Sequence, residues 1–209
     1  MTWHSYLLFC GASLVLCASP GPDMIYLLSR CVAQGRRVGV VAALGINAGS
    51  YVHLLAAVTG LSAILATSAA AFTVVKWVGA AYLVFLGVRV LTGRSKPLTI
   101  TGEGLRGSDL KAVFWQGFLS DALNPKVALF FLALLPQFLP AGSTHRIRDL
   151  LLLGMTCIVI GLAFNLCLAM ASARVTSGLR RRPRATGWLQ KGMGAMFVGI
   201  GVSIAAERA

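Results

Sequence analysis

Two short polar stretches interrupt apolar runs of this chain, one in each half. Ser19-Pro20-Gly21-Pro22-Asp23 divides the first run, and Asp121-Ala122-Leu123-Asn124-Pro125-Lys126 divides another about 100 residues later. Lipid offers no hydrogen-bond partners, so a helix that opens at membrane depth has to face protein or a water-filled cavity. One discontinuous span in each half is typical of transporters that bind substrate at the middle of the membrane. The two breaks therefore predict a transporter.

The apolar runs set the fold class. Only 12% of the 209 residues are charged, about half the share in a soluble domain. Six runs are near or above the ~20 residues that a helical span needs. They predict an all-α integral membrane protein with six transmembrane helices in one transporter domain, 1–209. No Lys or Arg precedes the first run, so we expect it to stay as a helix rather than to be a cleaved signal. The runs are Trp3–Ser29, Val38–Ala66, Ala69–Leu91, Ala112–Phe138, Leu150–Ala173 and Trp188–Ala206.

Most of the net charge of +13 falls in three of the connections between these runs. Cytoplasmic loops of membrane proteins are enriched in Lys and Arg, so the pattern predicts that these three loops are cytoplasmic and that both termini lie outside. We expect the loops to contact anionic lipid of the bilayer and no nucleic acid. Their basic residues are Arg30, Arg36, Arg37, Arg94, Lys96, Arg106, Lys111, Arg174, Arg180, Arg181, Arg182, Arg184 and Lys191, against Arg146, Arg148 and Arg208 on the other face.

The third and sixth predicted helices share a spacing that indicates an internal repeat. Lys76, Gly79, Ala80 and Tyr82 are spaced like Lys191, Gly194, Ala195 and Phe197. A unit of three helices crosses the membrane an odd number of times, so a second copy enters from the opposite side and the repeat is inverted. We expect repeat 1 at about 1–92, a cytoplasmic linker at about 93–110 and repeat 2 at about 111–209.

The breaks should divide the first and fourth helices into half-helices. Proline removes a backbone donor and collides with the preceding turn, while Pro22 with Asp23, and Asn124 with Pro125, are good starts for new half-helices. Both second halves would then begin at the membrane interior, where two positive dipole ends suit a carboxylate or another small anion. The alternative is two proline kinks with a packing role only.

Asp23 and Asp121 are the acidic residues that we expect at membrane depth, and both adjoin a break. A carboxylate there usually faces a cavity, a partner or a proton route. Either one would hold a substrate ammonium group or take up a proton, while Lys126 would neutralise one of them or meet a substrate carboxylate. The structural alternative is an internal Asp–Lys ion pair. We expect Asp23→Asn or Asp121→Asn to abolish proton-coupled transport.

The second predicted helix carries small and polar residues with a bearing on packing and on the pathway. Gly35, Gly39, Gly45 and Gly49 form GxxxG steps that permit close helix contact, either inside the chain or in a homodimer. His53 is either a hydrogen-bonded structural residue or a proton relay. Asn47, and Asn165 in the fifth helix, either line the pathway or join helices.

Three other classes of protein fit less well. A thiol-disulfide electron carrier needs a cysteine in both broken spans, but none lies between Ala112 and Phe138. A metal exporter needs several convergent ligands, and only Asp23, Asp121 and His53 are at depth. An enzyme needs a nucleophile beside a base, and no motif places one. We expect no metal and no cofactor, and interpret the cysteines as packing residues: Cys10, Cys17, Cys31, Cys157 and Cys167.

Three sequence blocks, in this order and at this spacing, resemble the LysE/RhtB family of amino-acid exporters over nearly the whole chain. They are Ser19-Pro20-Gly21-Pro22 followed by Gly35, Gly39, Gly45 and Gly49; KWVGAAYLVFLG from Lys76 to Gly87; and Asn124-Pro125-Lys126 leading to Pro136-Gln137-Phe138. The resemblance implies efflux of small amino acids or their derivatives, of the homoserine, threonine, lysine or leucine type, from the cytoplasm across a bacterial inner membrane, driven by the proton motive force. The family motif positions carried onto this chain are Pro20, Gly21, Pro22, Asn124, Pro125 and Lys126, while Asp23 stands where the family often has Asn.

Overall fold

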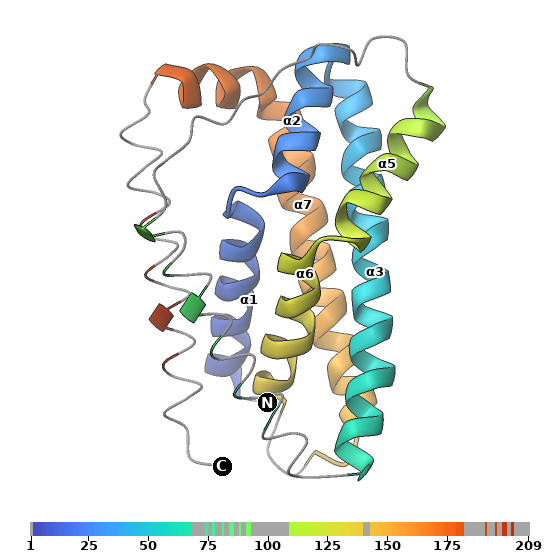
Figure 1. The fold of residues 1–209 in the computed structure, drawn as a ribbon, viewed down its shortest axis with the longest axis vertical. Helices are drawn as coiled ribbons and strands as arrows, with labels where there is room; N and C mark the ends of the chain where they lie inside the picture. The colour runs from blue at the N-terminus through green and yellow to red at the C-terminus, as the bar shows by residue number, and fades with distance from the viewer. Residues whose placement is uncertain are drawn as a thin grey trace.

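The computed structural model describes residues 2–67, 109–139 and 143–181, together with isolated positions between 74 and 92 and between 191 and 202. All regular structure in these residues is helical, which confirms the all-α prediction (Figure 1). The elements are α1 (Trp3–Ala18), α2 (Pro22–Gln34), α3 (Arg36–Thr67), α5 (Leu110–Ala122), α6 (Pro125–Leu129), the π-helical turn η1 (Phe130–Leu134), the 3-10 turn η2 (Leu135–Phe138) and α7 (Arg146–Arg181).

Two described helices are long and apolar enough to cross a membrane, over Arg36–Gly60 and Arg146–Arg174. Two bent pairs also qualify, α1 with α2 at 55° and α5 with Pro125–Phe138 at 47°, giving up to four spans in the described part of the chain. These are the first, second, fourth and fifth predicted helices, and the chain is a multi-pass membrane protein. The third and sixth, with the motifs at Lys76 and Lys191, the linker 93–110 and most of repeat 2 beyond α7, fall largely outside the described residues.

Both breaks begin where proline prevents a helix from continuing. α1 ends at Ala18, two residues before Pro20, and α2 begins with Pro22 at its first position after an extended Gly21. In the second break, Asn124 is the N-cap of α6 and its side chain accepts from the backbone N–H of Lys126, while Pro125 takes the first position. Each start follows the preference of proline for the first helical turn, where its missing N–H costs nothing.

At each break, the half-helix that ends there and the half-helix that begins there lie toward opposite ends of the bundle. Figure 1 shows α2 and α5 in the upper half and α1 and α6 in the lower half, with α3 and α7 running the full height behind them. One buried apolar cluster joins α1, η1 and η2 to α3 and α7 through residues such as Phe9, Phe130 and Leu150. A second joins α2 to α3, α5 and α7 through residues such as Leu27, Ile46 and Val113. The breaks lie between the two clusters.

Glycines bring α3 into backbone contact with α5. A Cβ atom on Gly45 would lie 2.1 Å from the carbonyl oxygen of Phe114, and one on Gly49 would lie 2.6 Å from that of Phe118. On α5, a Cβ on Gly117 would lie 2.8 Å from the carbonyl oxygen of Ala42. Only hydrogen fits at these distances, so Gly45 and Gly49 let the backbones of α3 and α5 approach each other.

A Cβ on Gly39 would lie 2.1 Å from Cys31 Sγ, whereas Gly35 makes no such close contact. Nothing lies within 4 Å of a Cβ at Gly35, and this residue has a φ of +87°. Gly35 ends α2 as its C-cap and lets the chain turn directly into α3. A positive φ is accessible to glycine without steric cost, so a glycine is needed at position 35 for its backbone conformation.

Arg30 also differs from its predicted place, which was a cytoplasmic loop. It lies inside α2 and is only 2% exposed. Its guanidinium donates to Gln34 Oε1 (3.1 Å) and to Gln116 Oε1 of α5, and it lies 5.4 Å from the ring centroid of Tyr26. Tyr26 in turn donates to the carbonyl of Val113 (2.7 Å). Arg30 therefore joins α2 to α5 rather than facing lipid headgroups.

Candidate functional site

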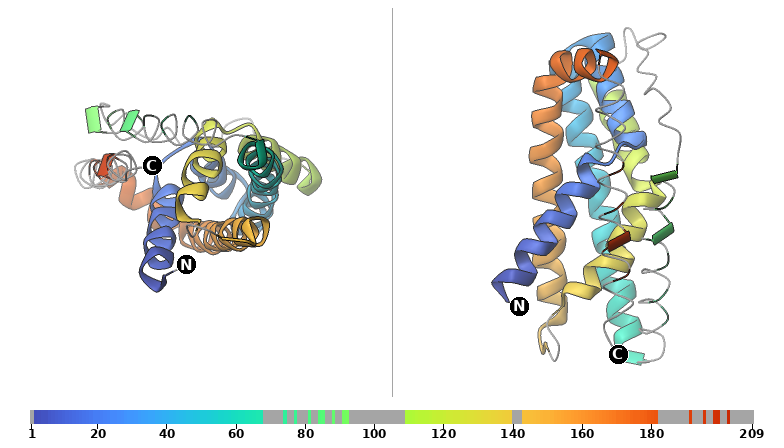
Figure 2. Two further views of the ribbon diagram at one scale, coloured as in Figure 1. Left: turned by 90° about the horizontal axis from the view of Figure 1, so that it is seen from below. Right: turned by 90° about the vertical axis from the view of Figure 1, so that its left-hand side faces the viewer.

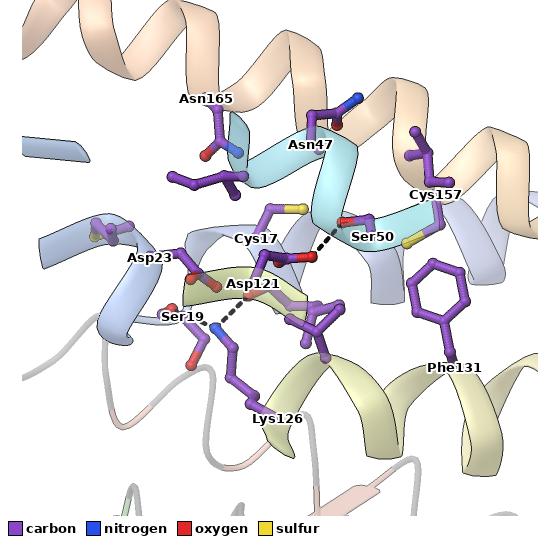
Figure 3. Close-up of a pocket in the computed structure, with 16 residues that line it drawn as sticks. Cys17, Ser19, Asp23, Asn47, Ser50, Asp121, Lys126, Phe131, Cys157 and Asn165 are labelled. Atoms are coloured by element: carbon purple, nitrogen blue, oxygen red, sulfur yellow. Dashed lines mark hydrogen bonds between the residues drawn. The ribbon is translucent and has the colours of Figure 1, made fainter. Parts of the chain in front are cut away.

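The two breaks meet at one place near the middle of the bundle. Asp23, in the first turn of α2, accepts hydrogen bonds on both carboxylate oxygens from the second broken span. Ser120 Oγ donates to Oδ1 (2.7 Å) and Asn124 Nδ2 donates to Oδ2 (2.5 Å). The start of α2 is thus joined to the end of α5 and the start of α6. Figure 3 shows Asp23 beside Asp121 and Lys126 of the second broken span. Residues about 100 positions apart in the sequence form a single polar centre.

Lys126 reaches back from α6 to the end of α1. Its ammonium donates to the carbonyls of Ser19 (2.9 Å) and Leu16 (3.2 Å). In a continuous helix the Leu16 carbonyl would accept from residue 20, but Pro20 has no N–H. Lys126 therefore satisfies a carbonyl that the proline leaves unpaired, and its positive charge lies at the negative end of the α1 dipole.

The Asp–Lys ion pair that we considered from the sequence is not formed. No ion pair within 4 Å joins Lys126 to Asp23 or Asp121, all three of which the structure describes. Gly21 contributes to this arrangement because a Cβ there would lie 3.2 Å from Lys126 Nζ, tighter than ordinary contact. A glycine at this position lets the ammonium lie against the opened backbone.

His53 contacts a backbone carbonyl at the second break, as Lys126 does at the first. Its Nε2 lies 2.8 Å from the backbone carbonyl oxygen of Asp121, to which it donates as the Nε2–H tautomer. Residue 125, the usual helical partner of that carbonyl, is again a proline, but the same carbonyl also accepts from the backbone N–H of Asn124 (2.8 Å), so His53 is its second donor. His53 is 6% exposed and is not among the residues that line the cavity described below; its bond agrees with the structural alternative, and a part in the pathway stays a prediction.

The Asp121 side chain is 2% exposed and has surroundings unlike those of Asp23. Its Oδ2 accepts from Ser50 Oγ of α3 (2.9 Å). Gly49 makes this approach possible because a Cβ on Gly49 would lie 2.8 Å from the Asp121 Cβ. The glycine contact between α3 and α5 therefore sets the position of a carboxyl group as well as the distance between two helices.

A cavity of about 60 Å³ lies between the breaks, α3 and α7. Five of the predicted residues line it: Asp23, Asn47, Asp121, Lys126 and Asn165. The predicted residues Pro20, Gly21, Pro22, Asn124 and Pro125 do not; they form the helix ends around it. Ligand sites usually measure about 300–1,000 Å³, so this space is smaller than a typical ligand site. The other lining residues are Leu16, Cys17, Ser19, Met24, Ile46, Ser50, Val127, Phe131, Cys157, Ile158 and Gly161.

Ser50 and Ser120 are the polar residues that sequence reasoning missed. Ser50 follows Asn47 by three positions, and residues three apart share one face of a helix, so this spacing was a usable signal. Ser120 adjoins Asp121 but bonds to Asp23, a pairing that no sequence pattern indicates. Cys17 and Cys157 also line the cavity, while Cys167 is exposed, so packing describes only some of the cysteines.

The half-helix ends are largely occupied by the protein's own groups. Asn124 Oδ1 accepts from the Lys126 N–H at the start of α6 (3.0 Å), and the Asp23 carboxylate lies in the first turn of α2. This differs from the expectation that both ends are left for a substrate anion. The described residues contain no group of three or more metal-type ligands, and the expected absence of a cofactor stays a prediction.

Comparison with known proteins identifies the family to which this chain belongs. Residues 14–208 match the family described as LysE type translocator. A Vibrio cholerae protein named "uncharacterized membrane protein" is 32% identical over all 209 residues of both chains. The homoserine/homoserine lactone efflux protein of Salmonella typhimurium is 29% identical, covering 99% of this chain and 97% of its own length. The leucine efflux protein of Salmonella choleraesuis is 23% identical, covering 96% and 94%. No solved structure matches this chain. With nearly its whole length matched, the chain belongs to the LysE type translocator family.

Proposed function

We propose that this protein exports small amino acids or close derivatives across a bacterial inner membrane in exchange for protons. Its family consists of translocators, so the prediction of a transporter and not an enzyme is confirmed. Relatives named for efflux of homoserine, homoserine lactone and leucine support this substrate class. The observation that carries the proposal is the buried carboxyl group of Asp121 at a small cavity between two broken spans.

The two carboxyl groups differ in their contacts, and we divide their functions accordingly. Both oxygens of Asp23 accept bonds from the second broken span, so Asp23 mainly holds the two breaks together. Asp121 accepts from the Ser50 hydroxyl and lines the cavity. A carboxyl group in a low-dielectric site is stabilised either by a proton or by a cation. Asp121 therefore takes a proton and a substrate ammonium group alternately, which couples their movements in opposite directions.

The arrangement of the membrane spans is part of the same proposal. Six spans in two inverted repeats, with both termini outside, agree with the charge pattern even after Arg30 is removed from the loop count. The two contacts across the breaks are reciprocal: Asp23 of the first broken span accepts from the second, and Lys126 of the second donates to the first. A site held by both halves can open to either side as one half rocks against the other.

Counterflow in proteoliposomes tests this function. Purified full-length protein is reconstituted with unlabelled leucine, homoserine or threonine inside, and uptake of the labelled compound is followed with and without a pH gradient. Asp121→Asn should abolish the response to the gradient because an amide cannot exchange a proton. Asp23→Asn should keep measurable exchange, because an asparagine can accept from Asn124 through its oxygen and donate to Ser120.

The matched control is Asp149→Asn, which removes a carboxylate bonded to Ser143 and Arg148 at the start of α7, away from the cavity. It should behave as the wild type. A wild-type pH response in Asp121→Asn would remove the proposed proton carrier, and a failure of every amino acid and derivative to exchange would remove the proposed function itself.

A further inference from the structure

The described wall of the cavity carries two carboxyl groups, Asp23 and Asp121, and one cationic side chain, Lys126. From this imbalance we infer that the site selects amines whose carboxyl group is masked, as in an amide, ester or lactone, over free amino acids. The inference rests on the proposed function because it concerns the substrate of the same site. Such a substrate carries a single positive charge and no carboxylate.

Lys126 is already engaged by the protein backbone. Two of the three hydrogens of its ammonium point to the carbonyls of Leu16 and Ser19. To bind a substrate carboxylate fully, the ammonium would have to leave carbonyls that have no other partner in the break, at the cost of burying unpaired polar groups. Among the described lining residues, no other cation is present for a substrate carboxylate.

The backbone offers little alternative for an anion. The N-terminal end of α6 is capped by Asn124, and the first turn of α2 carries the Asp23 carboxylate, which favours the same positive dipole end. A substrate carboxylate would therefore lie near two carboxyl groups of the protein, where like charges repel strongly because water is scarce.

The charge balance during exchange leads to the same conclusion. Once Asp121 has given up its proton, Asp23, Asp121 and Lys126 together carry one net negative charge. An amine with a masked carboxyl group brings one positive charge and makes the occupied site neutral. A free amino acid is a zwitterion, so its binding leaves the negative charge uncompensated inside the membrane, which is costly.

Pairs of compounds with the same side chain test this inference. Wild-type proteoliposomes are assayed for counterflow of leucine against leucinamide, threonine against threoninamide, and homoserine against homoserine lactone, at a pH where every amino group is protonated. We expect the masked member of each pair to exchange at least about tenfold faster at low concentration, as one poorly compensated charge interaction predicts. Equal or faster exchange of the free amino acids overturns the inference and leaves amino-acid export standing. Exchange of neither member removes the export function as well.

Asp23→Asn separates charge from cavity size. The substitution keeps the shape of the side chain and removes one negative charge, so the preference for the masked compound should fall several-fold toward equality. An unchanged preference would mean that volume selects the substrate, and the inference would fail. Because the variant can fold poorly, 3-methylbutylamine is used as a competitor of the wild type: it lacks a carboxyl group altogether and should inhibit leucinamide exchange better than leucine does. Stronger inhibition by leucine would equally overturn the inference.

Discussion

At the scale of single residues, a side chain donates to a backbone carbonyl at the end of the first half of each broken span. Pro20 and Pro125 remove the N–H groups that would bind the carbonyls of Leu16 and Asp121. Lys126 donates to the first carbonyl and His53 to the second. A backbone carbonyl left alone in the membrane interior costs several kcal/mol, so Lys126 stabilises the first break by satisfying the Leu16 carbonyl. His53 adds a second donor to the Asp121 carbonyl, which also accepts from the backbone N–H of Asn124.

The part played by His53 can be tested apart from transport because this residue does not line the cavity. His53→Leu should lower the melting temperature in detergent, since it removes one of the two donors to the Asp121 carbonyl, a net loss of about 0.5–1.5 kcal/mol. His53→Gln retains an N–H donor and should keep most of the stability and the pH-driven exchange. Equal losses of stability in the two variants would contradict the hydrogen-bonding role, and loss of the pH response in a stable His53→Gln protein would point to a proton relay.

At the scale of elements, the glycines of α3 make the α3–α5 contact closer than side chains allow. This contact carries Ser50 to Asp121 and His53 to the end of α5. The packing of α3 against α5 therefore also sets the position of the Asp121 carboxyl group. A larger residue at the contact should disturb both.

Gly45→Ala should destabilise the protein by about 1–3 kcal/mol, the usual cost of overpacking, because its Cβ would lie 2.1 Å from the Phe114 carbonyl. Gly60→Ala in the same helix is the matched control: nothing lies within 4 Å of its Cβ, and alanine should stabilise the helix by about 0.5–1 kcal/mol. Thermal unfolding of the purified variants measures both. Similar melting temperatures would show that α5 can move away from α3 without cost.

At the scale of the whole molecule, the two breaks divide the bundle into an upper and a lower half (Figure 2, right). The upper half is held by α2 against α5, where Arg30 and Gln116 meet. The lower half is held by α1, α6 and η1 around the aromatic rings of Phe9 and Phe130. α3 and α7 run through both halves, and polar contacts of Asp23 and Lys126 join the two broken spans between them.

Orientation in the membrane can be measured with reporters. If both termini lie outside, alkaline phosphatase fused after Ala209 should be active in bacteria and a green fluorescent protein fused there should be dark. The same reporters inserted in the loop 94–106 should give the reverse result, since that loop carries Arg94, Lys96 and Arg106. A fluorescent C-terminal fusion with an inactive phosphatase would contradict the proposed topology.

Much of the site was predictable because its parts are local. Proline before a polar residue indicates where a helix stops and starts, so Pro22 and the Asn124 cap were found directly. The placement of Arg30 was wrong because a charge count cannot distinguish a loop arginine from one buried against Gln116 of another helix. The positive φ of Gly35 could not be predicted because a GxxxG spacing does not reveal φ.

The sequence by itself determined the class of the protein and the position of its breaks. Apolar length, loop charge and proline act within a few residues, so they can be read along the chain. The tertiary structure alone decided which group meets which: that Lys126 binds carbonyls rather than a carboxylate, and that Asp23 is bonded on both oxygens while Asp121 faces the cavity. Such pairings join residues about 100 positions apart in the sequence, and only the packing of the bundle brings these residues together.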